Sequence, residues 1–166
     1  MFGVNRTGRA FLSVFDLRII VRINAKCGVT MSKETASNFF AECESGGGWN
    51  ACQKYCTSDA TFSCQALALE GVDTLSDYCD WMRGIYTPLP NAGYEIKSVT
   101  VNEDSSQVVF FAVFTGTHTG EGGPVPATGK SVRTDYVYII EFSGSKISHM
   151  TKVWNSESAN IQIGWQ

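Results

Sequence analysis

The chain has 166 residues, a formal net charge of −3, 43% hydrophobic residues and 17% charged residues. This length fits one domain, and this apolar content excludes a wholly disordered chain. A pI near 5.3 disfavours nucleic-acid binding, which usually needs a basic surface. Asp16, Arg18 and Arg22 interrupt the best apolar run, so no membrane span is expected.

Residues 1–30 differ from the rest in charge. They carry five basic side chains against Asp16 alone, so residues 31–166 hold a net charge of −7. We expect residues 1–30 to be a basic N-terminal extension: a leader, an organellar presequence, or sequence upstream of a true start at Met31. Residues 31–166 are expected to form the domain. The expected location is cytoplasmic, or organellar if the extension is a presequence.

Three helices are expected before the main run of strands. The first extends from Ser32 to about Glu44, with apolar residues at three- and four-residue steps. A short helix over residues 49–56 and a short strand over 60–65 follow. Asp73 is a plausible N-cap of the third helix, which continues to about Tyr86, before Pro88.

The rest of the chain changes to a period of two. This alternation predicts four long antiparallel strands: 94–102, 107–118, 130–142 and 146–154. Helices with one short strand, followed by a run of strands, indicate an α+β fold. A curved antiparallel sheet wrapped on three N-terminal helices would leave a concave pocket.

The six cysteines do not form a recognisable metal or disulfide pattern. They stand at positions 27, 43, 52, 56, 64 and 79, with no CxxC pair and only two histidines in the chain. We therefore expect reduced, buried thiols and no metal site.

Several short segments follow one another in the second half of the chain: Gly116-Thr117-His118-Thr119-Gly120-Glu121, Pro124, Pro126, Thr128-Gly129-Lys130, Gly144-Ser145-Lys146-Ile147, Trp154-Asn155 and Gln162-Ile163-Gly164. In this order they resemble the SnoaL-like polyketide cyclase and ester cyclase group of the nuclear transport factor 2-like superfamily. The resemblance covers residues 31–166 and implies a cone-shaped α+β barrel.

The resemblance also implies a reaction. Members of this group close rings by an intramolecular aldol reaction, in which a carboxyl group moves a proton without metal or cofactor. The family's acid stands seven residues before the terminal glutamine, and this position is Asn155 here. An amide can donate a hydrogen bond but does not relay a proton as a carboxyl does. The alternative is a non-catalytic ligand-binding or dimerisation module.

Three further residues are candidates for the chemistry. His149 shares its strand face with Asn155 if the alternation is regular, and would be a base in the neutral pH range. His118 ends the second long strand, where the resemblance places a histidine at the pocket mouth. Asp135 is expected to point outward, because the aromatic side of its strand favours the concave face; a bulge would turn it inward.

Aromatic residues could wall the pocket, or form ordinary core: Phe62, Trp81, Tyr136, Tyr138 and Trp154. The expected ligand is a hydrophobic, carbonyl-bearing small molecule, and cyclase, isomerase or dehydratase chemistry would need no cofactor. The superfamily resemblance implies a homodimer, and an outward face with Val137 and Ile139 is compatible with that.

Overall fold

The computed structural model describes residues 31–166, so the expectations for residues 1–30 and for Cys27 lie outside the described residues. A first helix covers residues 31–44. It is followed by α2 (Gly48–Cys52), a 3-10 turn (Gln53–Tyr55), β1 (Cys56–Cys64), a second 3-10 turn (Leu67–Leu69) and α3 (Leu75–Ile85). The remainder is β2 (Gly93–Val101), β3 (Gln107–Thr117), β4 (Ser131–Ser143), β5 (Lys146–Trp154) and α4 (Ser156–Ile163).

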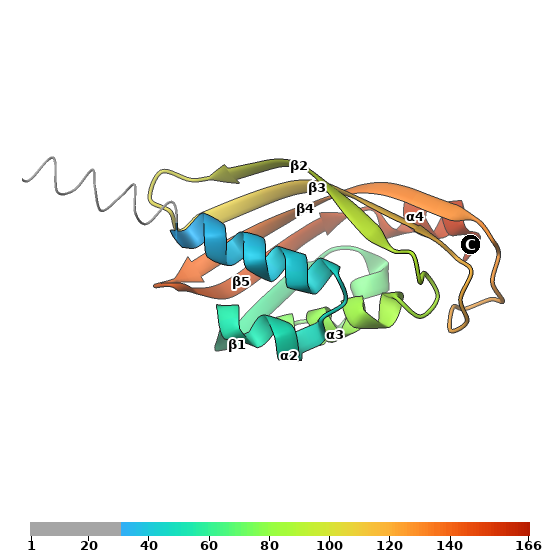
Figure 1. Cartoon of the computed structure of the whole chain (residues 1–166), viewed down its shortest axis with the longest axis horizontal. Coiled ribbons are helices and arrows are strands. Elements are labelled where there is room, and N and C mark those ends of the chain that lie inside the picture. The colour runs from blue at the N-terminus through green and yellow to red at the C-terminus, as the bar shows by residue number, and fades with distance from the viewer. Residues whose placement is uncertain (1–30) are drawn as a thin grey trace, which may run out of the picture.

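Within residues 31–166 the sheet has five strands, in the order β1-β5-β4-β3-β2. The pairs from β5 to β2 are antiparallel, as expected, whereas β1 pairs with β5 in parallel. The sheet is therefore mixed rather than wholly antiparallel. In Figure 1 the helix over residues 31–44 runs along the sheet, and α2 and α3 lie beside β1. The α+β prediction is confirmed.

The first helix forms because its apolar residues recur on one face. Ala36, Phe39, Phe40 and Cys43 are all fully buried. The helix ends at Glu44, and the chain turns away at Gly46, whose φ of +76° is a left-handed conformation that glycine adopts without a steric cost. The Phe40 ring stacks on Phe110 of β3, with ring centroids 4.6 Å apart, and so anchors the helix to the sheet.

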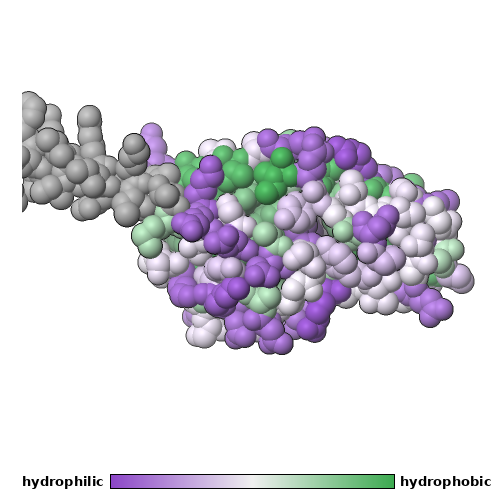
Figure 2. All heavy atoms as spheres, in the orientation of Figure 1, coloured by the Kyte–Doolittle hydropathy of each residue, from purple (hydrophilic) through white to green (hydrophobic). Residues whose placement is uncertain are grey.

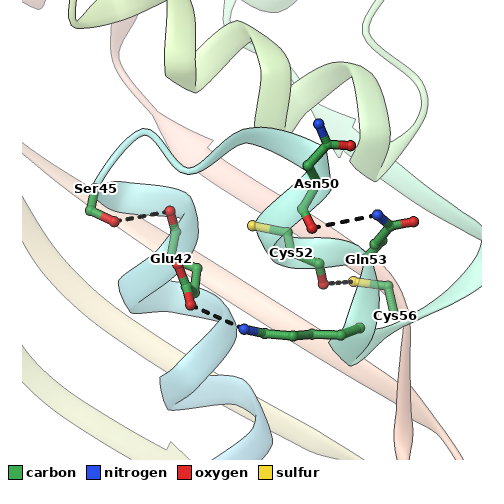
Figure 3. A network of polar contacts seen from close by, with 7 residues as sticks. Glu42, Ser45, Asn50, Cys52, Gln53 and Cys56 are labelled. Atoms are coloured by element: carbon green, nitrogen blue, oxygen red, sulfur yellow. Dashed lines mark hydrogen bonds and ion pairs between the residues drawn. The ribbon is translucent and has the colours of Figure 1, made fainter.

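Polar contacts join the first helix to the segment that contains α2 and the 3-10 turn (Figure 3). Lys54 donates to the Glu42 carboxylate at 3.2 Å. The Cys56 thiol contacts the Cys52 carbonyl oxygen at 3.6 Å, where the 3-10 turn leads into β1. The Lys54–Glu42 ion pair lies at the surface, so it contributes little to stability.

A β-bulge in β5 decides which side chains face the helices. Glu141 pairs with His149 and Phe142 pairs with Ile147, so Ser148 is an extra residue on β5. Ile147 is buried before the bulge, and Met150 and Lys152 are buried after it. The expected regular alternation over this strand is therefore wrong beyond Ser148.

The helix α4 was not expected from the sequence. Asn155 caps it, since its side-chain oxygen accepts a hydrogen bond from the Ser158 amide at 3.0 Å. Gly164 ends it with a φ of +78°. A correction also applies to α3, whose N-cap is Thr74 rather than Asp73.

One edge of the sheet is β2, and most of its residues are exposed. Ile96 is 42% exposed there, and Figure 2 shows apolar and hydrophilic patches side by side along the upper edge where β2 lies. No helix within residues 31–166 is both long enough and apolar enough to cross a membrane.

Candidate functional site

A pocket lies between the inner face of the sheet, the end of the first helix, α3 and α4. It encloses about 50 Å³ of free space, which is enough for a few water-sized groups. Its wall is almost entirely apolar, and the exceptions are Glu44, Tyr136, Lys152 and Asn160. The lining residues are Glu44, Ala68, Trp81, Met82, Ile85, Leu89, Phe114, Val132, Tyr136, Lys152, Trp154, Ala159, Asn160, Ile163 and Trp165.

Glu44 places a carboxyl group in this apolar wall. It is the last residue of the first helix and is only 2% exposed. Burial raises the pKa of the Glu44 carboxyl above its ordinary value, and the charge of Lys152 opposes the rise in part. Glu44 can therefore exchange a proton nearer to neutral pH than an exposed glutamate can.

A chain of hydrogen bonds joins Glu44 to Lys152. The Tyr138 hydroxyl donates to the Glu44 carboxylate, and the Tyr138 and Tyr78 hydroxyls bond to each other. Lys152 Nζ in turn donates to the Tyr78 hydroxyl at 2.9 Å. Two tyrosine hydroxyls therefore connect the acid with the amine inside the core.

The Lys152 amine is surrounded by aromatic rings. Its Nζ lies 4.7 Å from the Trp154 ring centroid and between 5.2 and 5.7 Å from four others. Those four rings belong to Tyr78, Trp81, Tyr136 and Tyr138. Ring faces attract cations, whereas burial disfavours the charge. Burial lowers the pKa of Lys152 below its ordinary value, and Glu44 restores it in part.

Tyr136 brings an unused donor to the same wall. Its residue is 2% exposed, and within residues 31–166 its hydroxyl makes no hydrogen bond of normal length, although it lies close enough to the Glu44 carboxyl to shift the pKa of both groups. Leaving a buried hydroxyl unpaired costs about 1–3 kcal/mol. An unpaired donor at a pocket wall can be satisfied by an acceptor atom of a ligand.

Of the five aromatic residues singled out by the sequence, three line the pocket. They are Trp81, Tyr136 and Trp154. Phe62 and Tyr138 lie in the adjoining core instead, where Phe62 stacks on Tyr78 at 4.2 Å. Tyr138 contacts the site through its bond to Glu44.

His149 lies outside the lining of this pocket. The bulge at Ser148 puts it with Thr61, Ser63 and Thr151 on the other face of the sheet. Its Nδ1 lies 2.7 Å from the Thr61 hydroxyl, and its Nε2 lies 3.1 Å from Thr151 and 3.2 Å from Ser63. Both ring nitrogens are thus engaged with hydroxyl groups.

His118 lies behind the pocket wall. It is fully buried, and its Nδ1 accepts a hydrogen bond from the Trp165 indole at 3.1 Å. Because an indole only donates, this bond places the proton of neutral His118 on Nε2. Trp165 lines the pocket, so the structure gives His118 contact with a wall residue rather than with the pocket space.

Asp135 and Asn155 also lie away from the pocket. Asp135 is exposed on the outward face of β4, as the aromatic alternation predicts. Asn155 caps α4 and borders a second, more open cleft of about 600 Å³, which Lys152 and Trp154 also line. The two hollows are therefore neighbours.

Three cysteines form the one cluster within residues 31–166 that could hold a metal ion. The Sγ atoms of Cys43, Cys52 and Cys79 lie within 4.8 Å of one another, and all three residues are fully buried. They come from the first helix, α2 and α3, outside the pocket lining. Structural zinc sites almost always take four ligands, so three thiols make an incomplete set for zinc.

Sequence reasoning missed Glu44 and Lys152, although each left a signal. Glu44 follows Phe40 by four residues, so a charged residue stands on the buried face of a helix. Lys152 stands between Met150 and Trp154 at the period of a strand. The sequence interpretation placed Ile147 and His149 on one face of the strand and therefore Lys152 on the other. The bulge that reverses these positions cannot be seen in the alternation of residue types.

The fold and this pocket define a class: an α+β protein with helices on one face of a mixed sheet and a small apolar pocket between them. The family model for SnoaL-like polyketide cyclases matches residues 34–163. The chain belongs to the SnoaL-like polyketide cyclase family, within the nuclear transport factor 2-like fold.

Solved structures agree with this fold. A SnoaL-like protein of Jannaschia sp. CCS1 superposes with a TM-score of 0.68 and 19% identity, covering 82% of this chain and 94% of the other. AclR of Streptomyces galilaeus, whose suggested activity is hydroxylation, superposes with a TM-score of 0.67 and 20% identity. The match covers 83% of each chain.

A third structure carries a small molecule. It is a protein of Catenulispora acidiphila DSM 44928 with a ketosteroid isomerase-like fold, in complex with trimethylamine. Its TM-score is 0.59 at 18% identity, covering 79% of this chain and 92% of the other. No curated protein matches the chain.

Proposed function

We propose that the pocket binds a hydrophobic carbonyl compound and moves a proton on the carbon next to the carbonyl, without a cofactor. Such a step underlies cyclisation, isomerisation and dehydration. One observation carries the proposal: an unpaired Tyr136 hydroxyl and a buried Glu44 carboxyl share one apolar wall. The first is a free donor and the second is an acid or base.

Each group has a role that follows from its surroundings. Glu44 takes the proton from carbon, because its raised pKa makes it a stronger base than an exposed carboxylate. Tyr136 donates to the carbonyl oxygen, where negative charge develops as the proton leaves. The apolar wall keeps water from competing for both groups. Glu44 would thus supply the carboxyl that position 155 lacks.

The family and one relative support a ligand of this kind. SnoaL-like cyclases act on carbonyl compounds, as the resemblance implies. The relative in complex with trimethylamine shows that this fold can hold a small molecule. The pocket of this chain is small, so we expect the carbonyl end of a larger ligand to occupy it.

Proton exchange on a simple ketone tests the proposal. Cyclopentanone or acetylacetone is incubated with the protein in deuterated water, and NMR follows deuterium at the carbons next to the carbonyl. We expect the protein to accelerate exchange above buffer, and Glu44→Gln and Tyr136→Phe each to reduce that acceleration. Exchange at the buffer rate with the unaltered protein would contradict the proposal.

The second candidate is a binding module without turnover. It is favoured by Asn155, whose amide stands at the position of the family's acid and is used to cap α4. Under this reading, tryptophan fluorescence would report ligand binding beside Trp81 and Trp154 while no proton exchange occurs.

We also propose that the chain forms a homodimer through the outward face of the sheet. Phe111, Val137 and Val153 lie directly opposite one another across β3, β4 and β5. Phe111 is 38% exposed and Val153 is 57% exposed. A second copy of the same row would cover these side chains.

A further inference from the structure

We propose that Lys152 forms a covalent imine with the carbonyl carbon of the substrate. This inference rests on the proposed function in one respect, because it requires that a carbonyl compound enters the pocket. It adds a nucleophile that the resemblance to SnoaL-like cyclases does not supply. Lys152 would activate the same substrate whose neighbouring carbon Glu44 deprotonates.

The placement of Lys152 fits this role. Its residue is 6% exposed and lines the pocket, and within the described part of the chain its Nζ makes one hydrogen bond, to Tyr78. No salt bridge to a carboxylate fixes it among the described residues. The amine is therefore held at a known point and kept from water, while its lone pair is available once a proton has left.

The hydrogen-bond chain offers that proton a destination. When Lys152 is charged, it donates to Tyr78, Tyr78 can donate to Tyr138, and Tyr138 donates to Glu44. Passing one proton along each bond leaves a neutral amine and a neutral carboxylic acid. An apolar site favours this neutral pair over two buried charges. The lowered pKa of Lys152 and the raised pKa of Glu44 point in the same direction.

The covalent step balances without an oxidant or reductant. The neutral amine attacks the carbonyl carbon, and the carbonyl π electrons move to oxygen, which accepts a hydrogen bond from Tyr136. Transfer of a proton from nitrogen to oxygen gives a carbinolamine. The hydroxyl then leaves as water, taking the proton that Glu44 held, and the nitrogen lone pair forms the C=N bond. The products are a protonated imine, a Glu44 carboxylate and one water.

The surroundings suit the product as well as the amine. A protonated imine is a cation, and it forms where five aromatic rings already surround Nζ. The Glu44 carboxylate regenerated in this step is the base that then removes the adjacent proton. The resulting enamine carbon can attack a second carbonyl group, which would close a ring.

Reductive trapping tests the inference. The full chain is incubated with cyclopentanone and sodium cyanoborohydride at neutral pH, and peptide mapping by mass spectrometry measures alkylation at each lysine. We expect Lys152 to be alkylated at least about tenfold faster than exposed Lys33, because a carbonyl compound bound in the pocket is held beside the Lys152 amine, whereas Lys33 meets it only from solution. Alkylation of Lys152 no faster than Lys33 would overturn the inference.

Matched variants sharpen the result. Lys152→Met removes the adduct from this peptide, whereas Lys33→Met leaves labelling of Lys152 unchanged. Glu44→Gln slows labelling of Lys152, because the carbinolamine hydroxyl loses the acid that protonates it as it leaves. If Lys152→Met does not fold, the comparison of labelling at Lys152 and Lys33 within the unaltered protein still tests the inference.

The exchange assay separates this inference from the proposed function. Deuterium exchange without a Lys152 adduct would overturn the imine and leave proton transfer by Glu44 standing. A Lys152 adduct without exchange above buffer would support the imine and contradict the proposed proton transfer. An adduct together with exchange that falls in Lys152→Met would support both.

Discussion

Glu44 and Lys152 carry opposite charges when ionised and are both buried at the pocket wall. Their energetic effect follows from the cost of desolvating a charge, which is larger than the gain from a long contact through two hydroxyls. Burying both residues therefore lowers the free energy of unfolding, as is common for functional groups. Two measurements at the scale of single residues examine this cost.

The first prediction concerns the pH dependence of stability. Folded Glu44 keeps its proton to higher pH than the ordinary value of 4.5, so over that window the folded state binds more protons than the unfolded state. The free energy of unfolding then falls as pH rises through the window. Glu44→Gln removes this contribution, because glutamine does not titrate.

Urea unfolding of Glu44→Gln and the unaltered protein across this window measures the effect. We expect the variant to gain relative stability as pH rises above 4.5. Tyr138 and Tyr136 are unchanged in the variant, and loss of the Glu44 charge lowers the pKa of Lys152 further, which changes relative stability in the same direction. A difference that stays constant with pH would contradict the raised pKa.

The second prediction compares two tyrosines on the same strand. Tyr136→Phe deletes an unpaired hydroxyl, so we expect stability to be unchanged or raised by about 1 kcal/mol. Tyr138→Phe deletes a hydroxyl bonded to both Glu44 and Tyr78, so we expect a loss of about 1–3 kcal/mol. Thermal unfolding of both variants checks the order, and equal losses would count against an unpaired Tyr136.

At the scale of elements, one bulge determines which residues reach the pocket. With regular alternation His149 would face the helices, and Lys152 would face outward. The extra residue Ser148 exchanges these positions. Sequence alternation predicted the limits of β5 correctly but not the bulge, because serine at this position carries no local signal that distinguishes it from a paired residue.

The connection after β3 gives the third prediction. A Cβ at Gly120 would lie 1.9 Å from the Thr87 carbonyl oxygen, so Gly120→Ala must displace backbone. We expect a loss of about 1–3 kcal/mol. Gly84, inside α3, has no neighbour within 4 Å of such a Cβ. Gly84→Ala should be neutral or stabilising by up to about 1 kcal/mol.

Differential scanning calorimetry of the two glycine variants measures this contrast. Loss of stability in Gly120→Ala alone is the expected outcome. A similar change in both variants would mean that the approach of residue 120 to Thr87 does not constrain the fold.

At the scale of the whole molecule, the sequence predicted the order of helices and strands well. Strand alternation placed β2 to β5 within one or two residues of their observed limits. The parallel pairing of β1 with β5 was not predicted, because it joins Thr61 to His149 and local patterns do not encode such distant partners. The pocket residues were partly predicted, since aromatic side chains mark it but Glu44 and Lys152 become neighbours only through the fold.

The fourth prediction concerns assembly. Val153→Glu places a charge in the outward row of the sheet, whereas Ile161→Glu changes an equally exposed residue on α4. We expect light scattering after size exclusion to give a dimer for the unaltered protein and for Ile161→Glu, and a monomer of about 18.1 kDa for Val153→Glu. A monomeric unaltered protein would exclude the proposed interface.

The most direct test of the central claim is a crystal structure with bound acetylacetone. The account predicts one ligand oxygen within hydrogen-bond distance of the Tyr136 hydroxyl, and the carbon between the two carbonyl groups next to the Glu44 carboxyl. A ligand seated instead in the open cleft beside Asn155, with Tyr136 and Glu44 uncontacted, would contradict it.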